Sequence, residues 1–422
     1  MLRAADQDLV VRDPAIPGLA VLLDDEALGR WLSEQMQTTV RVRVRYLRYK
    51  HATSCVLAGD VDLPQSGSAC LVSAYAHPDT VKMTKTLTRA PAGSVLGVDP
   101  ARGLLATTPA ADRDLPALGV LDDDMRRRRL LRRLLGDRTG LRHATLQTLR
   151  HKPHRRWVGI MQPRHGPQAV LRCYRPGRAH AATEAIAAWA GGEPRTPRLL
   201  GVYPRRGIAA VDFLPGRLLP QGTVTDFRAA GEALARLHSR PEVLLRTSGP
   251  VSEARAVRAS AGLLSVLLPD MADDLDDLAD MLTDRLVAME QVRRPIHGDF
   301  SADQVVIGDR GVGLLDLDSA RLADPAVDLA CASASTTLDV VLGHLGCTTA
   351  EQRMGALHGG YALVADTPDE ARLATHEAAH LLRRAIEPFR LRTTPDWPSA
   401  SRDLAERARK RLSGTTVAGG AR

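Results

Sequence analysis

Residues 297–304 read HGDFSADQ, and residues 314–330 read LLDLDSARLADPAVDLA. Asp299 lies in a short polar loop, and Asp316 follows an apolar run. Phosphoryl transfer needs a carboxylate that orients the acceptor hydroxyl and accepts its proton. It also needs oxygen ligands that hold Mg²⁺ against the phosphates. Two aspartates that point into one cleft would meet both needs.

The residues between the two aspartates predict a β-hairpin. The apolar run VVI at 305–307 is typical of a strand, and GDRG at 308–311 is typical of a tight turn. The run VGLL then returns as the partner strand. Such a hairpin brings Asp299, Gln304 and Asp316 close together without help from any other segment.

Length and composition set the broad class. The chain has 422 residues and is 44% apolar, so we expect two or three globular domains. The N-terminus lacks the pattern of a secretory signal, and no apolar run reaches the roughly 18 residues of a membrane span. The five scattered cysteines form no CxxC pair, which is typical of reduced thiols. We therefore expect a cytoplasmic protein.

The charge is basic, with a net value of +8, and this is compatible with an anionic ligand such as ATP. The densest basic run is RRRRLLRRLLGDR at 126–138. Its four leucines have helical spacing, which predicts a helix packed on a core with a solvated arginine face. No aromatic residues interleave the arginines, as binding of single-stranded nucleic acid would require. We expect no nucleic-acid partner and no membrane partner.

An internal repeat organises the first half of the chain. Residues 97–116 and residues 201–220 are identical at nine of twenty aligned positions. LRYK at 47–50 also parallels LRHK at 149–152. The period of about 103 residues exceeds that of solenoid repeats, so we interpret it as two copies of one small domain. The first copy is predicted to contain a strand at 41–49 and a hairpin, and the second a strand, a hairpin, a helix at 180–191 and two short strands around a Pro/Gly turn.

The motif at 297–330 resembles the aminoglycoside phosphotransferase and choline-kinase-like family, small-molecule relatives of protein kinases. The similarity extends over about residues 140–390, through AVLR, TEAIAAWAGG, PRLLGVY, GIAAVDFLPGR and ALARLHS. It implies an α+β, bilobal protein-kinase-like fold with a β-rich N-lobe and a helical C-lobe. The predicted parts are an N-lobe-like α+β cap that is a degenerate duplicate (1–120), the N-lobe (121–220), the C-lobe (221–412) and a disordered tail (413–422).

The resemblance assigns the catalytic and metal-binding positions. Asp299 matches the catalytic base, and Asp316 matches the aspartate that holds Mg²⁺. Gln304 stands where the family usually has asparagine, although maltokinase-like members look similar in having glutamine there. The longer side chain keeps the amide oxygen that can bind the metal. His297 and Asp328 are expected to be structural.

The resemblance also implies the nucleotide contacts. Arg172 stands where the family has a phosphate-binding lysine, and Glu184 matches the helix glutamate that pairs with it. Arginine keeps the cation but is larger and planar, so the exchange is not neutral. No glycine-rich phosphate loop is present, and KPHRRW stands in its place, either as a phosphate contact through Lys152, Arg155 or Arg156 or as a solvated turn. Asp212 and Phe213 match the hinge that binds adenine.

These observations support an ATP- and Mg²⁺-dependent O-phosphotransferase. Its acceptor is predicted to be a hydroxyl of a small molecule such as a sugar, aminosugar or aminoglycoside-like compound. A kinase of peptide Ser/Thr in natural-product biosynthesis is one alternative, and an inactive nucleotide-binding pseudokinase is another. Asp299 and Asp316 both persist, which favours a working enzyme. The sequence does not indicate the acceptor, the choice between ATP and GTP, or the oligomeric state.

Two further stretches admit a second interpretation. HEAAH at 376–380 fits a zinc-binding pattern, but it lies inside the kinase-like region, where we expect an ordinary helix. The segment 270–284 contains seven aspartates. It is either a site for a cationic aminosugar or the solvated face of a helix that buries its leucines.

Overall fold

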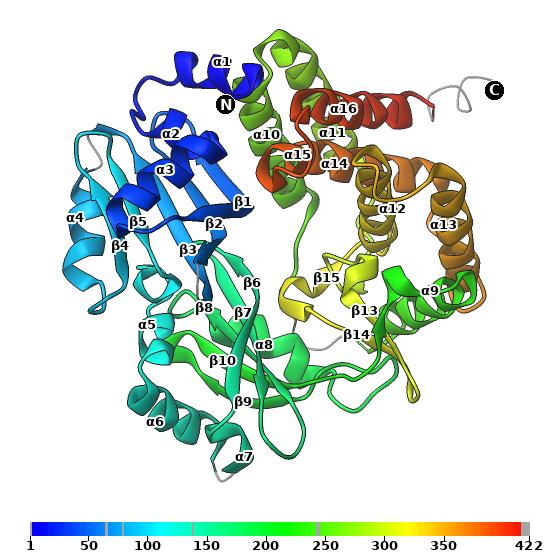
Figure 1. Cartoon of the computed structure of the whole chain (residues 1–422). Coiled ribbons are helices and arrows are strands. Elements are labelled where there is room, and N and C mark those ends of the chain that lie inside the picture. Colours follow the sequence, from blue (N-terminus) through cyan, green and yellow to red (C-terminus); the bar gives the residue numbers. More distant parts are fainter. Residues whose placement is uncertain (1, 64–65, 78–79, 137–138, 242–244, 415–422) are drawn as a thin grey trace. The chain divides into compact units, whose positions relative to one another are not determined.

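The computed structural model describes residues 2–63, 66–77, 80–136, 139–241 and 245–414 (Figure 1). The chain forms two compact units. Unit 1 comprises Met1–His180, Leu200–Phe213 and Phe389–Pro395, and unit 2 comprises Ala181–Leu199, Leu214–Pro388 and Asp396–Arg422. Unit 1 is built on β-sheets and unit 2 is mainly helical, which confirms the α+β class. No helix within the described ranges has the length and apolar character needed to cross a membrane.

Unit 1 contains two five-stranded sheets that share one topology. The first has the order β1-β2-β3-β5-β4 and the second the order β6-β7-β8-β10-β9. The first sheet consists of β1 (Arg41–Lys50), β2 (Ser54–Leu63), β3 (Ser66–Tyr75), β4 (Val95–Asp99) and β5 (Leu104–Thr107). The second consists of β6 (Thr145–Lys152), β7 (Arg156–Gln162), β8 (Ala169–Tyr174), β9 (Leu199–Tyr203) and β10 (Ile208–Asp212). A helix follows the third strand of each sheet along the chain, α4 (Thr80–Arg89) or α8 (Ala179–Ala188).

Local details repeat together with the topology. The β1–β2 ladder shifts register after Val44, and the β6–β7 ladder shifts after Thr148. A glycine at φ 63° precedes the last strand of each copy, at Gly103 and Gly207. A Cβ there would lie 2.5 or 2.2 Å from a backbone oxygen, so only glycine fits both turns. The matching glycines in the sequence therefore reflect one backbone geometry used twice.

The two copies also open in the same way, and this corrects part of the sequence alignment. DPAIPGL at 13–19 corresponds to DRDLPAL at 112–118. Asp13 accepts a hydrogen bond from the Ala52 backbone N–H at 3.0 Å, and Asp112 accepts the equivalent bond from His154 at 2.9 Å. Residues 112–116 therefore open the second copy and do not pair with 216–220, because the chain takes another path once β5 has ended. Helices α2 (Leu19–Leu23) and α3 (Asp25–Met36) correspond to α5 (Ala117–Asp122) and α6 (Asp124–Leu135).

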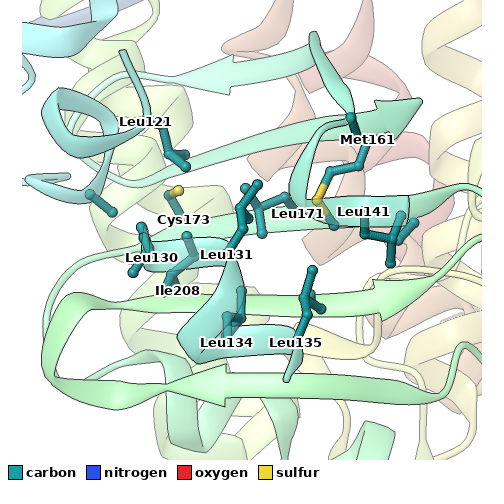
Figure 2. Close-up of a cluster of buried hydrophobic side chains, with 14 of the residues drawn as sticks. Leu121, Leu130, Leu131, Leu134, Leu135, Leu141, Met161, Leu171, Cys173 and Ile208 are labelled. Atoms are coloured by element: carbon teal, nitrogen blue, oxygen red, sulfur yellow. The ribbon is translucent and has the colours of Figure 1, made fainter. Parts of the chain in front are cut away.

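Helix α6 packs its leucines on the second sheet (Figure 2). Their partners include Leu171 and Cys173 of β8 and Ile208 of β10. Each fully buried leucine contributes about 1.5–3 kcal/mol to stability. The predicted apolar stripe is thus confirmed; its members are Leu130, Leu131, Leu134 and Leu135.

A segment from near the C-terminus belongs to unit 1. Within it, Arg392 forms two hydrogen bonds with the Asp6 carboxylate, at 2.7 and 2.6 Å, and a third with the Leu23 carbonyl at 3.1 Å. The Arg392 side chain is 6% exposed and that of Asp6 is fully buried. This bidentate pair ties α1 (Ala4–Arg12) to the C-terminal segment of the same unit.

Unit 2 holds the catalytic motif between helices. Its helices are α9 (Val224–His238), α10 (Pro250–Leu267), α11 (Ala272–Ala288), α12 (Ala326–Val341), α13 (Cys347–Ala362), α14 (Glu370–Arg384) and α16 (Trp397–Ser413), and α15 (Glu387–Leu391) leads into the unit 1 segment. Helices α9 and α13 meet at Gly231 and Gly360, where a Cβ would lie 1.9 and 2.0 Å from the facing carbonyl oxygens. Of the predicted disordered tail, Ser413 ends α16, and 415–422 lie outside the described residues.

Candidate active site

The catalytic loop leaves a short ladder that strands β12 (Arg294–Ile296) and β15 (Arg321–Ala323) form. Gly298 adopts φ 84°, and a Cβ there would lie 2.2 Å from the Ser319 carbonyl oxygen. His297 is fully buried, and its Nε2 lies 2.6 Å from the Leu315 carbonyl oxygen. A carbonyl can only accept, so Nε2 donates. The sequence His297–Gly298 thus shapes the backbone that presents Asp299, as expected for a structural histidine.

Asp328 of α12 holds this loop by hydrogen bonds to its backbone. Its carboxylate accepts hydrogen bonds from the backbone N–H groups of His297, at 2.6 Å, and Gly298, at 2.7 Å. It also contacts Nε2 of His238 at 3.0 Å, and Nδ1 of His238 lies 2.9 Å from the Tyr361 hydroxyl. Burial alone would raise the pKa of Asp328, but the hydrogen bond with His238 and the nearby backbone donors hold it below its ordinary value. Asp328 therefore stays ionised and fixes the loop.

The predicted hairpin places Gln304 and Asp316 next to the catalytic loop. Gln304 ends a turn of 3₁₀-helix and leads into β13 (Val305–Gly308), which pairs with β14 (Gly311–Leu314). The Leu315 N–H donates to the Gln304 carbonyl at 2.8 Å, and the Leu315 carbonyl accepts from His297. One residue therefore ties the strand end that carries Asp316 to both Gln304 and the loop of Asp299. The local association predicted for the three residues has this physical basis.

Asp316 lies just beyond β14, which ends at Leu314, and it adopts a left-handed conformation with φ 57° and ψ 51°. Residues other than glycine adopt this conformation at a cost that folded proteins often accept at functional sites. Gln304 is 9% exposed, and its amide nitrogen lies 3.4 Å from Asp303. The amide nitrogen donates in this contact, so the amide oxygen of Gln304 is not used in it.

Two residues that the sequence analysis did not identify lie behind Asp299. The Cys331 thiol of α12 is 3.8 Å from Asp299 Oδ1, and the Arg384 guanidinium of α14 is 3.3 Å from Cys331 Sγ. Burial raises the pKa of Cys331 to about 11, so the thiol stays protonated and can donate. Burial would lower the pKa of Arg384, but Cys331 and Asp299 raise it. No local motif marks these residues, because only helix packing brings them to the loop.

A second set of contacts, made by charged side chains, also supports the loop. Arg321 donates to the Gly298 carbonyl at 3.2 Å, and its guanidinium lies 3.7 Å from Glu253. Glu253 lies 3.1 Å from Nδ1 of His376, and Nε2 of His376 lies 3.8 Å from Asp324. Neither contact has the geometry of a well-directed hydrogen bond, so the attraction is mainly electrostatic. His376 of the HEAAH stretch, which lies in α14, thus pairs with the carboxylates of Glu253 in α10 and of Asp324.

The His376 cluster predicts a pH dependence of stability. Burial would lower the pKa of His376, but Asp324 and Glu253 raise it to about 9 from 6.5. The raised pKa means that the contribution to stability is fully present below pH 6.5 and is lost as the pH rises to about 9. We expect His376→Gln to flatten the pH dependence of the unfolding free energy over this window, measured by urea titration. His358 has a lowered pKa, so His358→Gln is the control and should act only below pH 6.5. An unchanged slope in His376→Gln would contradict the prediction.

The predicted nucleotide contacts fall mainly in unit 1. Arg172 lies in β8, its Cα paired with Ala209 of β10 and Val158 of β7, and its side chain is buried. Lys152 ends β6, Asp212 ends β10, and Phe213 is 37% exposed. Glu184 lies in α8 within unit 2, so its pairing with Arg172 stays a prediction.

The turn between β6 and β7 has an anchor that the sequence analysis missed. Asp112 is buried and contacts Nδ1 of His154 at 2.9 Å and Nε2 of His151 at 3.1 Å, besides the His154 backbone N–H. Burial would raise the pKa of Asp112, but the two histidines lower it strongly. The Asp-x-x-Ile/Leu-Pro pattern shared by 13–17 and 112–116 was the available signal. The turn that replaces a glycine-rich loop is therefore held by a buried carboxylate.

The acidic stretch forms the exposed face of α11. Its leucines are buried, and its aspartates are exposed, in agreement with a solvated helix face. Among the described residues, no cluster of His, Cys, Asp and Glu has the arrangement of a metal site. The ligands proposed from the sequence are one amide, Gln304, and one carboxylate, Asp316, which flank the β13–β14 hairpin.

The loop of Asp299 is followed by the β13–β14 hairpin and then by Asp316. This order defines a class, the kinase-like enzymes. Residues 156–361 match the model of the phosphotransferase enzyme family, from the first residue of β7 into α13. This segment, just under half of the chain, is similar to that family, and the protein is an enzyme that transfers phosphate to hydroxyl groups. The predicted family resemblance is confirmed. Among curated proteins, no sequence matches this chain.

Solved structures agree in fold at low sequence identity. The amicoumacin kinase hAmiN has a TM-score of 0.50 and 13% identity, and the match covers 71% of this chain and 96% of that chain. The choline kinase from Cryptosporidium parvum Iowa II has a TM-score of 0.50 and 8% identity, with 70% and 97% of the two chains covered. The kinase-like fold predicted from the sequence is confirmed.

Proposed function

We propose that the protein is an ATP- and Mg²⁺-dependent kinase that phosphorylates a hydroxyl group of a small molecule. The observation that carries the proposal is the junction at Leu315, which joins Gln304, the Asp316 strand end and the Asp299 loop. A sugar, aminosugar or aminoglycoside-like compound is the proposed acceptor. The similar amicoumacin kinase was solved in complex with AMP-PNP, Ca2+ and Ami, so this fold accommodates a nucleotide, a divalent cation and a second ligand.

The donor set fits the proposed metal. Mg²⁺ prefers carboxylate and amide oxygens, which Asp316 and Gln304 supply. The contact of Gln304 with Asp303 uses the amide nitrogen, so it leaves the amide oxygen for this role. When bound, Mg²⁺ would neutralise charge on the phosphates and orient them. Gln304 thus replaces asparagine without loss of the chemical group.

The chain's own residues supply positioning and proton transfer. We assign Asp299 as the group that accepts the proton of the acceptor hydroxyl while that oxygen forms a bond to the γ-phosphorus. The bond from this phosphorus to the bridging oxygen breaks, and ADP leaves. The Cys331 thiol lies at one Asp299 oxygen and Arg384 lies behind the thiol, so the carboxylate has a fixed orientation before substrate arrives. We assign Arg172 to the phosphates, where its planar group can bind two oxygens at once.

The test is mass spectrometry of an acceptor panel incubated with enzyme and Mg-ATP. The panel contains aminoglycosides, maltose, glucosamine and simple amino alcohols. We expect a phosphate on one acceptor class with the wild type, no product with EDTA, and none with Asp299→Asn. Nucleotide binding is measured on the same samples. Absence of both product and Mg-ATP binding would overturn the proposal, and tight binding without product would favour the pseudokinase alternative.

A further inference from the structure

Two helices of the chain carry opposite charges in equal number. Helix α6 carries six arginines and one aspartate, and helix α11 carries six aspartates and one arginine. Each helix buries its leucines and exposes most of its charged side chains. One helix belongs to unit 1 and the other to unit 2.

The fold does not require the arginines of α6. The equivalent helix in the first copy, α3, has the same length and also buries an apolar face. Its exposed positions include one arginine, Arg30, together with Asp25, Glu26 and Glu34. An acidic exposed face therefore serves the fold equally well at this position. Comparison of the two copies therefore indicates that packing of this helix does not require the arginine face.

The arginine face of α6 has a defined centre. Met125, Arg129 and Arg132 are spaced by four and three residues, so they lie along one line of the helix. All three are exposed, and Arg129 and Arg132 have no ion-pair partner within the described part of the chain. Asp123 and Asp124 pair only with the arginines of the first turns. Two surface hollows of about 510 and 460 Å³ lie along this face, both lined by Arg126 and Arg129.

The acidic face of α11 has a matching line. Asp273, Asp277, Asp280 and Asp284 are spaced by four, three and four residues. At 1.5 Å rise per residue they extend over about 16 Å, and the arginines of α6, from Arg126 to Arg133, extend over about 10 Å. Asp280 pairs with Arg258, whereas Asp277 and Asp284 have no ion-pair partner among the residues that the structure covers.

Each face also exposes one methionine. Met125 of α6 is 75% exposed, and Met281 of α11 is 43% exposed. Methionine is enriched in protein interfaces, where its flexible side chain adapts to irregular surfaces. A charged helix face that only serves solubility has no need of such a residue.

We propose that the α6 face of one copy of this chain binds the α11 face of a second copy. The two faces complement each other in sign and in number of charges. A nucleic acid is less well matched, since the arginines lack interleaved aromatic residues and an anionic backbone offers nothing to Met125. Because different surfaces meet, the contact is heterologous and joins copies head to tail.

The strength of the contact follows from its exposure. Exposed ion pairs contribute about 0.2–1 kcal/mol each and weaken with salt. The association is therefore concentration-dependent, electrostatically steered and lost at high ionic strength. It is independent of the proposed catalytic function.

The test is sedimentation velocity of the full-length protein over a range of concentrations at low and high salt. One variant carries Arg126→Glu, Arg129→Glu and Arg132→Glu, and the other carries Asp276→Lys, Asp277→Lys and Asp284→Lys. Each alone is expected to associate at least roughly tenfold more weakly than the wild type. Their equimolar mixture is expected to recover association, because the reversed faces attract each other again.

A matched control separates the face from net charge. The substitutions Arg30→Glu, Arg41→Glu and Arg89→Glu change the charge equally at exposed positions of the first copy. The control is expected to associate as the wild type does. The proposal would be overturned if the wild type stayed monomeric at low salt, or if the control associated as weakly as the charge-reversed variants. It would also be overturned if the mixture of these variants did not recover association. So would a monomer that binds duplex DNA through the same arginines.

Discussion

Asp299→Asn is expected to lower kcat by about 10²–10⁴-fold, the usual contribution of a positioned general base. Asparagine has nearly the same shape and keeps an oxygen for the Cys331 thiol, which lies 3.8 Å away in the wild type. The loop should therefore keep its structure, held by Asp328 through the backbone of His297 and Gly298. Rates are measured by ADP release with the acceptor that the panel identifies. Affinity for Mg-ATP should change little, because the substitution affects proton acceptance and not the assigned phosphate contacts.

Asp309→Asn is the matched control. Asp309 lies exposed in the hairpin turn between β13 and β14, so it undergoes the same chemical change outside the site. It is expected to keep the wild-type rate. If Asp299→Asn retained kcat within a factor of about three while the control behaved as expected, Asp299 would not be the general base.

The second large effect concerns stability. Arg392→Met is expected to lower the unfolding free energy by about 3–5 kcal/mol, because it leaves the buried Asp6 carboxylate without its bidentate partner. The pair is 6% and 0% exposed, so water cannot replace the lost contacts. The quantity is measured by urea unfolding followed by circular dichroism. The double variant Asp6→Leu/Arg392→Met should lower the unfolding free energy by less than the single variant does, since no buried charge remains.

The chain provides a contrasting pair for comparison. Arg402 also contacts both oxygens of an aspartate, Asp270, at 2.7 and 2.6 Å. Its side chain is 36% exposed and that of Asp270 is 60% exposed. Arg402→Met should therefore cost no more than about 1 kcal/mol. Equal losses in the two arginine variants would show that burial does not set the strength of the Asp6–Arg392 pair.

Local patterns were sufficient for much of the fold, including the hairpin beside the proposed site. Alternation at 41–49 predicted β1, leucine spacing predicted α6 and α11, and the run from 305 to 314 predicted a hairpin. These elements depend on residues close in sequence, so periodicity reveals them. The link that Leu315 makes between Gln304 and His297 is also local, whereas the roles of Asp299, Gln304 and Asp316 stay predictions. Helices α2, α3 and α5 were not predicted from the sequence.

The supports of the site could not be predicted, because they come from residues far apart in sequence. Cys331 and Arg384 reach Asp299 only after α12 and α14 pack, and His238 reaches Asp328 only after α9 packs. None of these residue types is unusual in a helix, so the sequence gives no signal for the contact.

The sequence by itself determined the enzyme class, the hairpin at 305–314 and the repeated strand pattern of the first half, because each is encoded in a short ordered motif or in direct similarity. Only the tertiary structure decided where the second copy begins, which side chains hold the loop, and that Arg392 completes unit 1. The physical reason is that an unpaired buried charge is unfavourable, and packing can supply the partner from any position along the chain. Asp112, Asp328 and Asp6 each found partners that packing alone supplied.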